Sequence, residues 1–76
     1  MKEKFEWMNE AESWLDYWTD GVPTYDQVEG ELNTIEGVED CLEYSDCESV
    51  QEYAEILWSY MVKAMKDRGY VLDEEV

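Results

Sequence analysis

The hydrophobic positions near the N-terminus repeat with the period of an α-helix. Large apolar side chains recur at spacings of three and four residues and cover about 120° of a helical wheel, as one face of an amphipathic helix requires. These residues are Trp7, Met8, Ala11, Trp14, Leu15 and Trp18. We interpret the tryptophan stripe as core, with a platform that stacks a ligand as the alternative. Gly21 and Pro23 are expected to end this helix.

A second helix is predicted to follow directly. Thr24-Tyr25-Asp26-Gln27 is typical of a capping box, in which the Thr24 hydroxyl and the Gln27 side chain bind free backbone N–H groups at the helix start. One apolar stripe continues the pattern, and Gly37 is the natural terminator. The stripe consists of Tyr25, Val28, Leu32 and Ile35.

Residues 38–44 are ambiguous between helix and strand. Val38, Cys41 and Leu42 fit a short helix, whereas Val38, Leu42 and Tyr44 fit alternate positions of a strand. The only other strand candidate is the short segment 70–72, and an isolated two-stranded pair is marginally stable. We therefore favour a helix or an irregular turn.

The third helix has the longest apolar face. Ser45-Asp46-Cys47-Glu48 offers a second capping box, and Gly69 is the predicted terminator. The face runs over more than four turns and is also typical of a homodimer seam. It consists of Val50, Tyr53, Ala54, Leu57, Trp58, Met61, Ala64 and Met65. The predicted fold class is therefore mainly α, a compact three-helix domain that comprises residues 1–76.

The excess of acidic residues is a stronger indication of function than any motif in the chain. The chain carries 21 acidic and five basic residues, a net charge of −16, with no Lys, Arg or His between Phe5 and Val62. A charge of −16 equals that of roughly 27 Å of duplex DNA, and a solid globule of this length is about 29 Å across. A field of one sign repels itself. We therefore expect the acidic surface to be the functional one.

Other classes of function are disfavoured by what the chain lacks. It contains no His and no Gly-rich phosphate loop, so we predict no catalytic residues, cofactor or metal, and no enzyme. Cys41 and Cys47 support neither a zinc site nor a disulfide scaffold, and we interpret them as reduced thiols, with a redox bridge as the alternative. There is no apolar run of membrane-spanning length and no signal-like N-terminus, which predicts a cytoplasmic protein without membrane contact.

In composition the whole chain resembles a class of small acidic DNA-mimic inhibitor proteins made by bacteriophages. These proteins are short, strongly acidic and rich in aromatic residues, as this His-free chain with four Trp and six Tyr is. The class includes inhibitors of restriction enzymes, of uracil-DNA glycosylase and of CRISPR systems, and a Bacillus-phage inhibitor of the histone-like protein HU. Their folds are unrelated and no motif is shared, so no residue role transfers. The resemblance implies a stoichiometric inhibitor that occupies a DNA-binding site, often as a homodimer.

The expected partner is a basic DNA-binding protein rather than nucleic acid, because a surface this negative is repelled by phosphate. An HU-type nucleoid protein is preferred, since one small domain fills its compact basic saddle; a restriction enzyme, nuclease, glycosylase or polymerase also fits. The alternative is an acidic helical adaptor or structural protein that uses apolar helix faces to bind a basic partner without imitating DNA. The predicted contact carboxylates are Asp26, Glu29, Glu31, Glu36, Glu39, Asp40 and Glu43, and we expect the six from Glu29 to Glu43 to form one continuous negative ridge.

Overall fold

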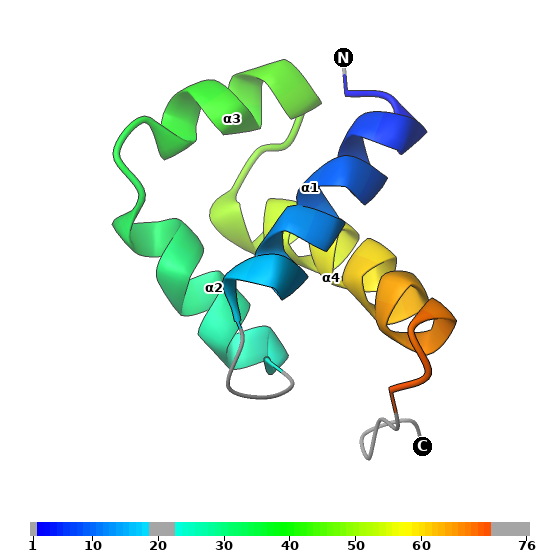
Figure 1. The fold of residues 1–76 in the computed structure, drawn as a ribbon. Coiled ribbons are helices and arrows are strands. Elements are labelled where there is room, and N and C mark those ends of the chain that lie inside the picture. The colour runs from blue at the N-terminus through cyan, green and yellow to red at the C-terminus, as the bar shows by residue number, and fades with distance from the viewer. Residues whose placement is uncertain (1, 19–22, 71–76) are drawn as a thin grey trace.

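The computed structural model describes residues 2–18 and 23–70, and within these ranges the chain forms four helices and no strand (Figure 1). The helices are α1 (Lys4–Tyr17), α2 (Tyr25–Thr34), α3 (Val38–Ser45) and α4 (Val50–Asp67). The mainly helical fold class is confirmed. The ambiguous segment is the short helix α3, so the described residues form four helices where three were predicted.

The start of α2 follows the predicted capping box, whereas the start of α4 does not. Thr24 Oγ1 accepts the backbone N–H of Gln27 at 3.2 Å, and Gln27 Oε1 accepts that of Thr24 at 2.9 Å. The predicted box at residues 45–48 is wrong, because Ser45 belongs to α3 and donates its hydroxyl to the Cys41 carbonyl at 2.7 Å. Ser49 caps α4 instead.

Two glycines in the left-handed conformation mark helix boundaries. Gly37 has a φ of +81°, but it is the N-cap of α3 and not the predicted terminator of α2, which ends at Thr34 with Ile35 as its cap. Gly69, with a φ of +87°, follows α4 as predicted. The Tyr70 N–H donates to the Met65 carbonyl at 2.9 Å, which completes a Schellman motif. The predicted stop at Gly21 lies outside the described residues.

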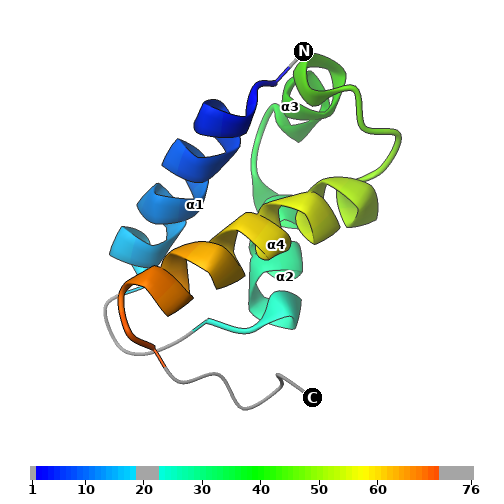
Figure 2. The same cartoon turned by 90° about the vertical axis from the view of Figure 1, so that its right-hand side faces the viewer.

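The core lies between α4 and the two helices that pack on it, α1 and α2. Figure 2 shows α1 to one side of α4 and α2 crossing behind α4, with α3 near the N-terminal end of α4. The apolar faces predicted from the sequence supply the buried residues: Trp7, Ala11 and Leu15 from α1, Val28 and Leu32 from α2, and Tyr53, Ala54, Leu57, Met61, Ala64 and Met65 from α4.

Burial of the α4 face bears on the expected homodimer. Ala54, Leu57 and Met61 have no exposed surface because α1 and α2 of the same chain cover them. This face is therefore not free to pair with a second copy. A homodimer stays a prediction, and it requires another surface.

No helix in the described ranges combines the length and the hydrophobicity needed to cross a lipid bilayer.

Candidate protein-binding surface

The predicted contact carboxylates are clustered most closely on α3. Glu39, Asp40 and Glu43 are all exposed, and their spacing of three and four residues places them on one helical face. The opposite side of α3 carries the half-buried Leu42 and the buried Ser45. We call Glu39, Asp40 and Glu43 the α3 acidic face; the exposed Glu36 precedes it in the turn from α2.

On α2 the carboxylates separate to two flanks. Glu29 and Glu31 are both half-buried, and two positions correspond to a rotation of about 200° around a helix. Glu31 borders one hollow that α1 residues also line and a second hollow that it shares with Trp18 and the exposed Asp26. Glu29 lies on the opposite flank. The structure therefore does not bring the six predicted ridge residues, from Glu29 to Glu43, into one continuous ridge.

Glu29 and Glu55 influence the phenol of Tyr25, which packs edge-on against Trp58 of α4. Burial raises the pKa of Tyr25, and the nearby negative charges of Glu29, Glu55 and Asp26 raise it further. The Tyr25 hydroxyl is buried and has no hydrogen-bond partner among the residues that the structure describes. Dense negative charge thus extends to the contact between α2 and α4.

Cations do not neutralise the α3 acidic face. The two ion pairs between described residues, Lys2 with Glu10 and Arg68 with Asp16, both use carboxylates of α1. The other basic residues lie in the first turn of α1 or in the last two turns of α4. Within the described ranges, the acids of α2 and α3 are therefore available to an external cation.

The dimensions of the domain suit a comparison with duplex DNA. The principal extents are 33 × 24 × 23 Å. A duplex as long as the 33 Å axis carries about 19 phosphate charges, and the chain has a net charge of −16. Average charge per length is thus close to that of DNA, while the arrangement of charge differs among the helices.

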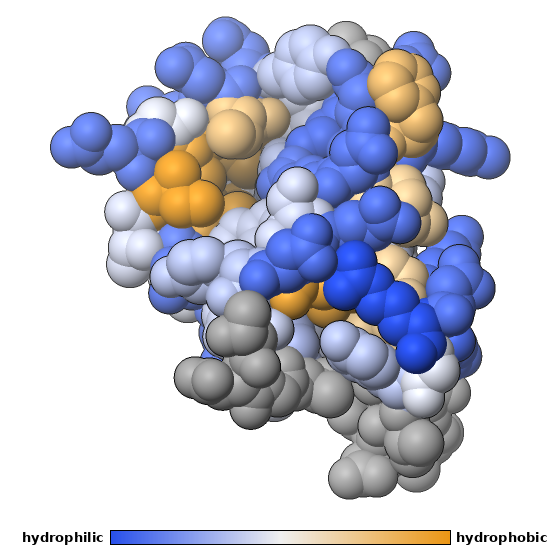
Figure 3. Space-filling model, viewed as in Figure 1, coloured by the Kyte–Doolittle hydropathy of each residue, from blue (hydrophilic) through white to orange (hydrophobic). Residues whose placement is uncertain are grey.

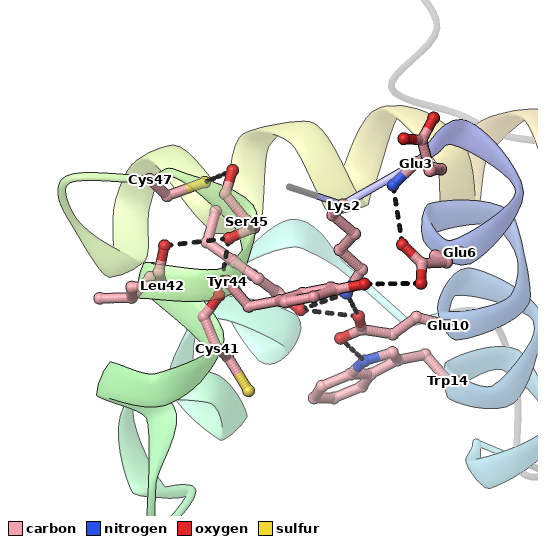
Figure 4. A network of polar contacts seen from close by, with 11 residues as sticks. Lys2, Glu3, Glu6, Glu10, Trp14, Cys41, Leu42, Tyr44, Ser45 and Cys47 are labelled. Atoms are coloured by element: carbon pink, nitrogen blue, oxygen red, sulfur yellow. Dashed lines mark hydrogen bonds and ion pairs between the residues drawn. The ribbon is translucent and has the colours of Figure 1, made fainter.

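A polar network that was not predicted from the sequence joins the N-terminal segment to α1 and α4 (Figure 4). Lys2 Nζ forms an ion pair with Glu10, donates to the Tyr53 hydroxyl at 2.7 Å and lies 4.5 Å from the centre of the Trp7 ring. The Tyr53 hydroxyl in turn donates to Glu10 Oε1 at 2.6 Å. Trp14 Nε1 donates to the other carboxylate oxygen at 3.2 Å. Three donors therefore satisfy one half-buried carboxylate.

The network has a structural role for which the sequence offered only weak signals. Burial raises the pKa of Tyr53, and its hydrogen bond to Glu10 adds to the shift. Because Lys2 contacts two aromatic rings and a carboxylate, it ties the start of the chain to the core. Glu10 lies at the edge of the α1 apolar stripe. From this position a carboxylate can face either solvent or a partner side chain, so the sequence does not predict the network.

A second polar contact holds α3 against α1. The Tyr44 hydroxyl donates to Glu6 Oε2 at 2.7 Å, and Glu6 Oε1 accepts the backbone N–H of Glu3 at 2.8 Å (Figure 4). The Glu3 N–H and then the Tyr44 hydroxyl lower the pKa of Glu6. Tyr44 therefore helps to set the orientation of α3 and of its acidic face.

Between α1 and α2 the surface is hollowed. Trp14, Tyr17 and Ile35 line a hollow of about 350 Å³, together with Ser13 and two carboxylates, Glu10 and Glu31. The Trp14 ring stacks on Trp18 with a centroid distance of 5.4 Å. In Figure 3 strongly hydrophobic atoms reach the surface over α2 and the turn to α3, within a surrounding that is mostly hydrophilic. Trp14 and Trp18 beside this hollow are only partly buried, whereas Trp7 belongs to the buried core.

The cysteines were interpreted as reduced thiols, and the structure describes both. Cys41 is exposed, Cys47 is half-buried, and both are free thiols. No three Cys, Asp or Glu side chains in residues 2–18 and 23–70 are arranged to hold a metal ion.

Comparison of the chain with protein-family models, with curated proteins and with solved structures finds no match.

Proposed function

We propose that the chain is a DNA-mimic inhibitor that occupies the basic DNA-binding surface of another protein and blocks its binding to DNA. The observation that carries the proposal is the α3 acidic face, whose exposed carboxylates form no ion pair with any described residue. Such a face lowers the stability of the isolated domain through self-repulsion. A basic partner removes that cost and gains the electrostatic attraction.

The geometry of the face supports recognition of a surface built for phosphates. Glu39 and Glu43 are four residues apart on α3, so their Cβ atoms are separated by about 5 to 6 Å. Asp40 extends the same face toward a hollow that contains Lys2 and Tyr44. Complementary charge accelerates association with a Lys/Arg-rich groove and suppresses binding to acidic proteins. Among the candidate partners, an HU-type nucleoid protein remains our preferred target.

One observation favours the second candidate, an acidic adaptor. The hollow between α1 and α2 exposes Tyr17 and Ile35, which a partner can cover without imitating DNA. An adaptor leaves the DNA-binding surface of its partner free, whereas a mimic cannot. Competition with DNA therefore separates the two functions.

The experiment captures partners from a bacterial lysate on the immobilised protein at low salt and then applies duplex DNA. Polyglutamate at the same charge concentration is the control, because it screens and competes by charge without the shape of a duplex. We expect DNA to release the captured proteins at a lower charge concentration than polyglutamate does. Captured proteins that bind labelled DNA while they remain on the resin would contradict the proposal and support the adaptor.

A further inference from the structure

The hollow between α1 and α2 combines carboxylates with two chemical features that the α3 acidic face lacks. Its walls are aromatic, from Trp14 and Tyr17; Ile35 adds an aliphatic surface; and carboxylates lie among the lining residues. Tyr17 is 68% exposed and Ile35 39% exposed, so these apolar groups are accessible from solvent. An aromatic face beside a carboxylate attracts a cation whose stem is apolar.

The walls are positioned by contacts within the chain. Trp14 is held from one side by its Nε1 hydrogen bond to Glu10 and from the other by the stacked ring of Trp18. Tyr17 also contacts Trp18, edge to face, with a centroid distance of 5.4 Å. The aromatic surface is therefore organised before a ligand binds, which lowers the entropic cost of binding.

The two carboxylates of the hollow are not equivalent. Glu10 already accepts hydrogen bonds from Lys2, Trp14 and Tyr53. Glu31 is half-buried, its carboxylate has no hydrogen bond or ion pair with any residue in the described ranges, and it also borders the neighbouring hollow beside Trp18. Glu31 is therefore the carboxylate in this hollow that is open to an incoming cation.

We propose that this hollow receives an arginine side chain of the basic partner. A planar guanidinium stacks on an aromatic ring and pairs with a carboxylate at the same time, and its aliphatic stem covers apolar surface. A lysine ammonium is more strongly hydrated and lacks the planar stack. The identity of the occupant as a protein side chain rests on the proposed function, which supplies the basic partner.

The test uses a tetra-arginine peptide with blocked ends, titrated into the isotopically labelled protein, with the equivalent tetra-lysine peptide as comparison. We expect the arginine peptide to shift the indole N–H resonances of Trp14 and Trp18 more than that of Trp7, and to bind more tightly than the lysine peptide. Tyr17→Ser is expected to weaken binding of the arginine peptide by about two- to fivefold through loss of the cation–π contact. Phe5→Ser is the matched control, because Phe5 is also on α1 and is 65% exposed.

A second pair of variants isolates the role of Glu31 from that of total charge. Glu31→Gln and Glu39→Gln remove the same charge, and we expect only Glu31→Gln to reduce the shift at Trp14. Equal effects within each pair, or equal binding of the two peptides, would overturn the arginine site. A dimer that Tyr17→Ser converts to monomer, measured by light scattering, would also overturn it, because a second copy would then be the occupant.

The same variants separate this inference from the proposed function. If DNA releases the captured partner and Tyr17→Ser and Glu31→Gln bind that partner as well as the natural protein does, the arginine site is wrong and DNA mimicry stands. If the peptide titration localises to the hollow as expected while DNA fails to compete for the partner, the arginine site stands and DNA mimicry is wrong.

Discussion

Removing the same phenolic oxygen from two tyrosines should change stability in opposite directions. The Tyr53 hydroxyl donates to Glu10 at 2.6 Å and accepts from Lys2 at 2.7 Å. The Tyr25 hydroxyl is buried and makes no hydrogen bond with a described residue. Tyr53→Phe therefore deletes two charge-assisted hydrogen bonds, and Tyr25→Phe deletes only a polar atom that is costly to bury.

The expected magnitudes follow from these contacts. Hydrogen bonds to charged groups contribute about 1.5 to 3 kcal/mol, so Tyr53→Phe should lower the free energy of unfolding by about 2 kcal/mol. Tyr25→Phe should raise it by up to about 1 kcal/mol, because an unsatisfied buried polar group is removed. A change of 1 kcal/mol shifts the melting temperature of a domain this size by about 4 to 8 °C.

The assay is thermal and urea unfolding followed by circular dichroism at neutral pH. Tyr53→Phe is expected to melt about 8 °C or more below the natural protein, while Tyr25→Phe melts at or above it. Equal shifts for the two variants, or a larger loss for Tyr25→Phe, would refute the assignment of the Lys2, Glu10 and Tyr53 network as a stabilising element.

Three further outcomes follow from charge and backbone conformation. Asp46 caps the C-terminus of α3 with a φ of +63°, a left-handed conformation that costs a non-glycine residue about 1 kcal/mol. Asp46→Gly should therefore raise the free energy of unfolding in urea by up to about 1 kcal/mol, and by more than Asp46→Asn does. Added salt should raise the melting temperature, because screening relieves self-repulsion, and should weaken partner binding in calorimetric titrations; a salt-independent affinity would exclude the electrostatic account. Because folding raises the pKa of Tyr53, the protonated Tyr53 hydroxyl contributes fully to stability below about pH 10, and this contribution decreases as the pH rises further. In thermal melts above about pH 10, the melting temperature of Tyr53→Phe should therefore fall less with pH than that of the natural protein.

The main features of the fold could be predicted from local patterns. Apolar residues at spacings of three and four identified the faces that α1, α2 and α4 bury, and Thr24 with Gln27 identified the start of α2. These features depend on residues that are close together in the sequence, and they could therefore be predicted from it. The apolar pattern of residues 38–44 fitted two periods, and only packing against α4 and the contact between Tyr44 and Glu6 select the helix.

The candidate site was less predictable because it depends on how helices face one another. Sequence order suggested that Glu29 and Glu31 belong to one ridge, yet the helical turn directs them to opposite flanks of α2. The polar network joins Lys2 to Tyr53 across 51 positions, so no local pattern reveals it. The hollow that holds Trp14 and Glu31 likewise exists only where α1 meets α2.

The central claim is that the α3 acidic face takes the place of DNA. The most direct test is to displace a labelled duplex from a captured DNA-binding protein and to measure the release of the duplex by fluorescence anisotropy. Two double variants with equal charge change are compared with the natural protein: Glu39→Lys with Glu43→Lys on the face, and Glu12→Lys with Asp67→Lys, both exposed, on α1 and α4. We predict full release of DNA by the natural protein and by the Glu12/Asp67 variant, and more than about tenfold weaker displacement by the Glu39/Glu43 variant. Equal weakening of the two variants, or simultaneous binding of DNA and this protein to the partner, would contradict it.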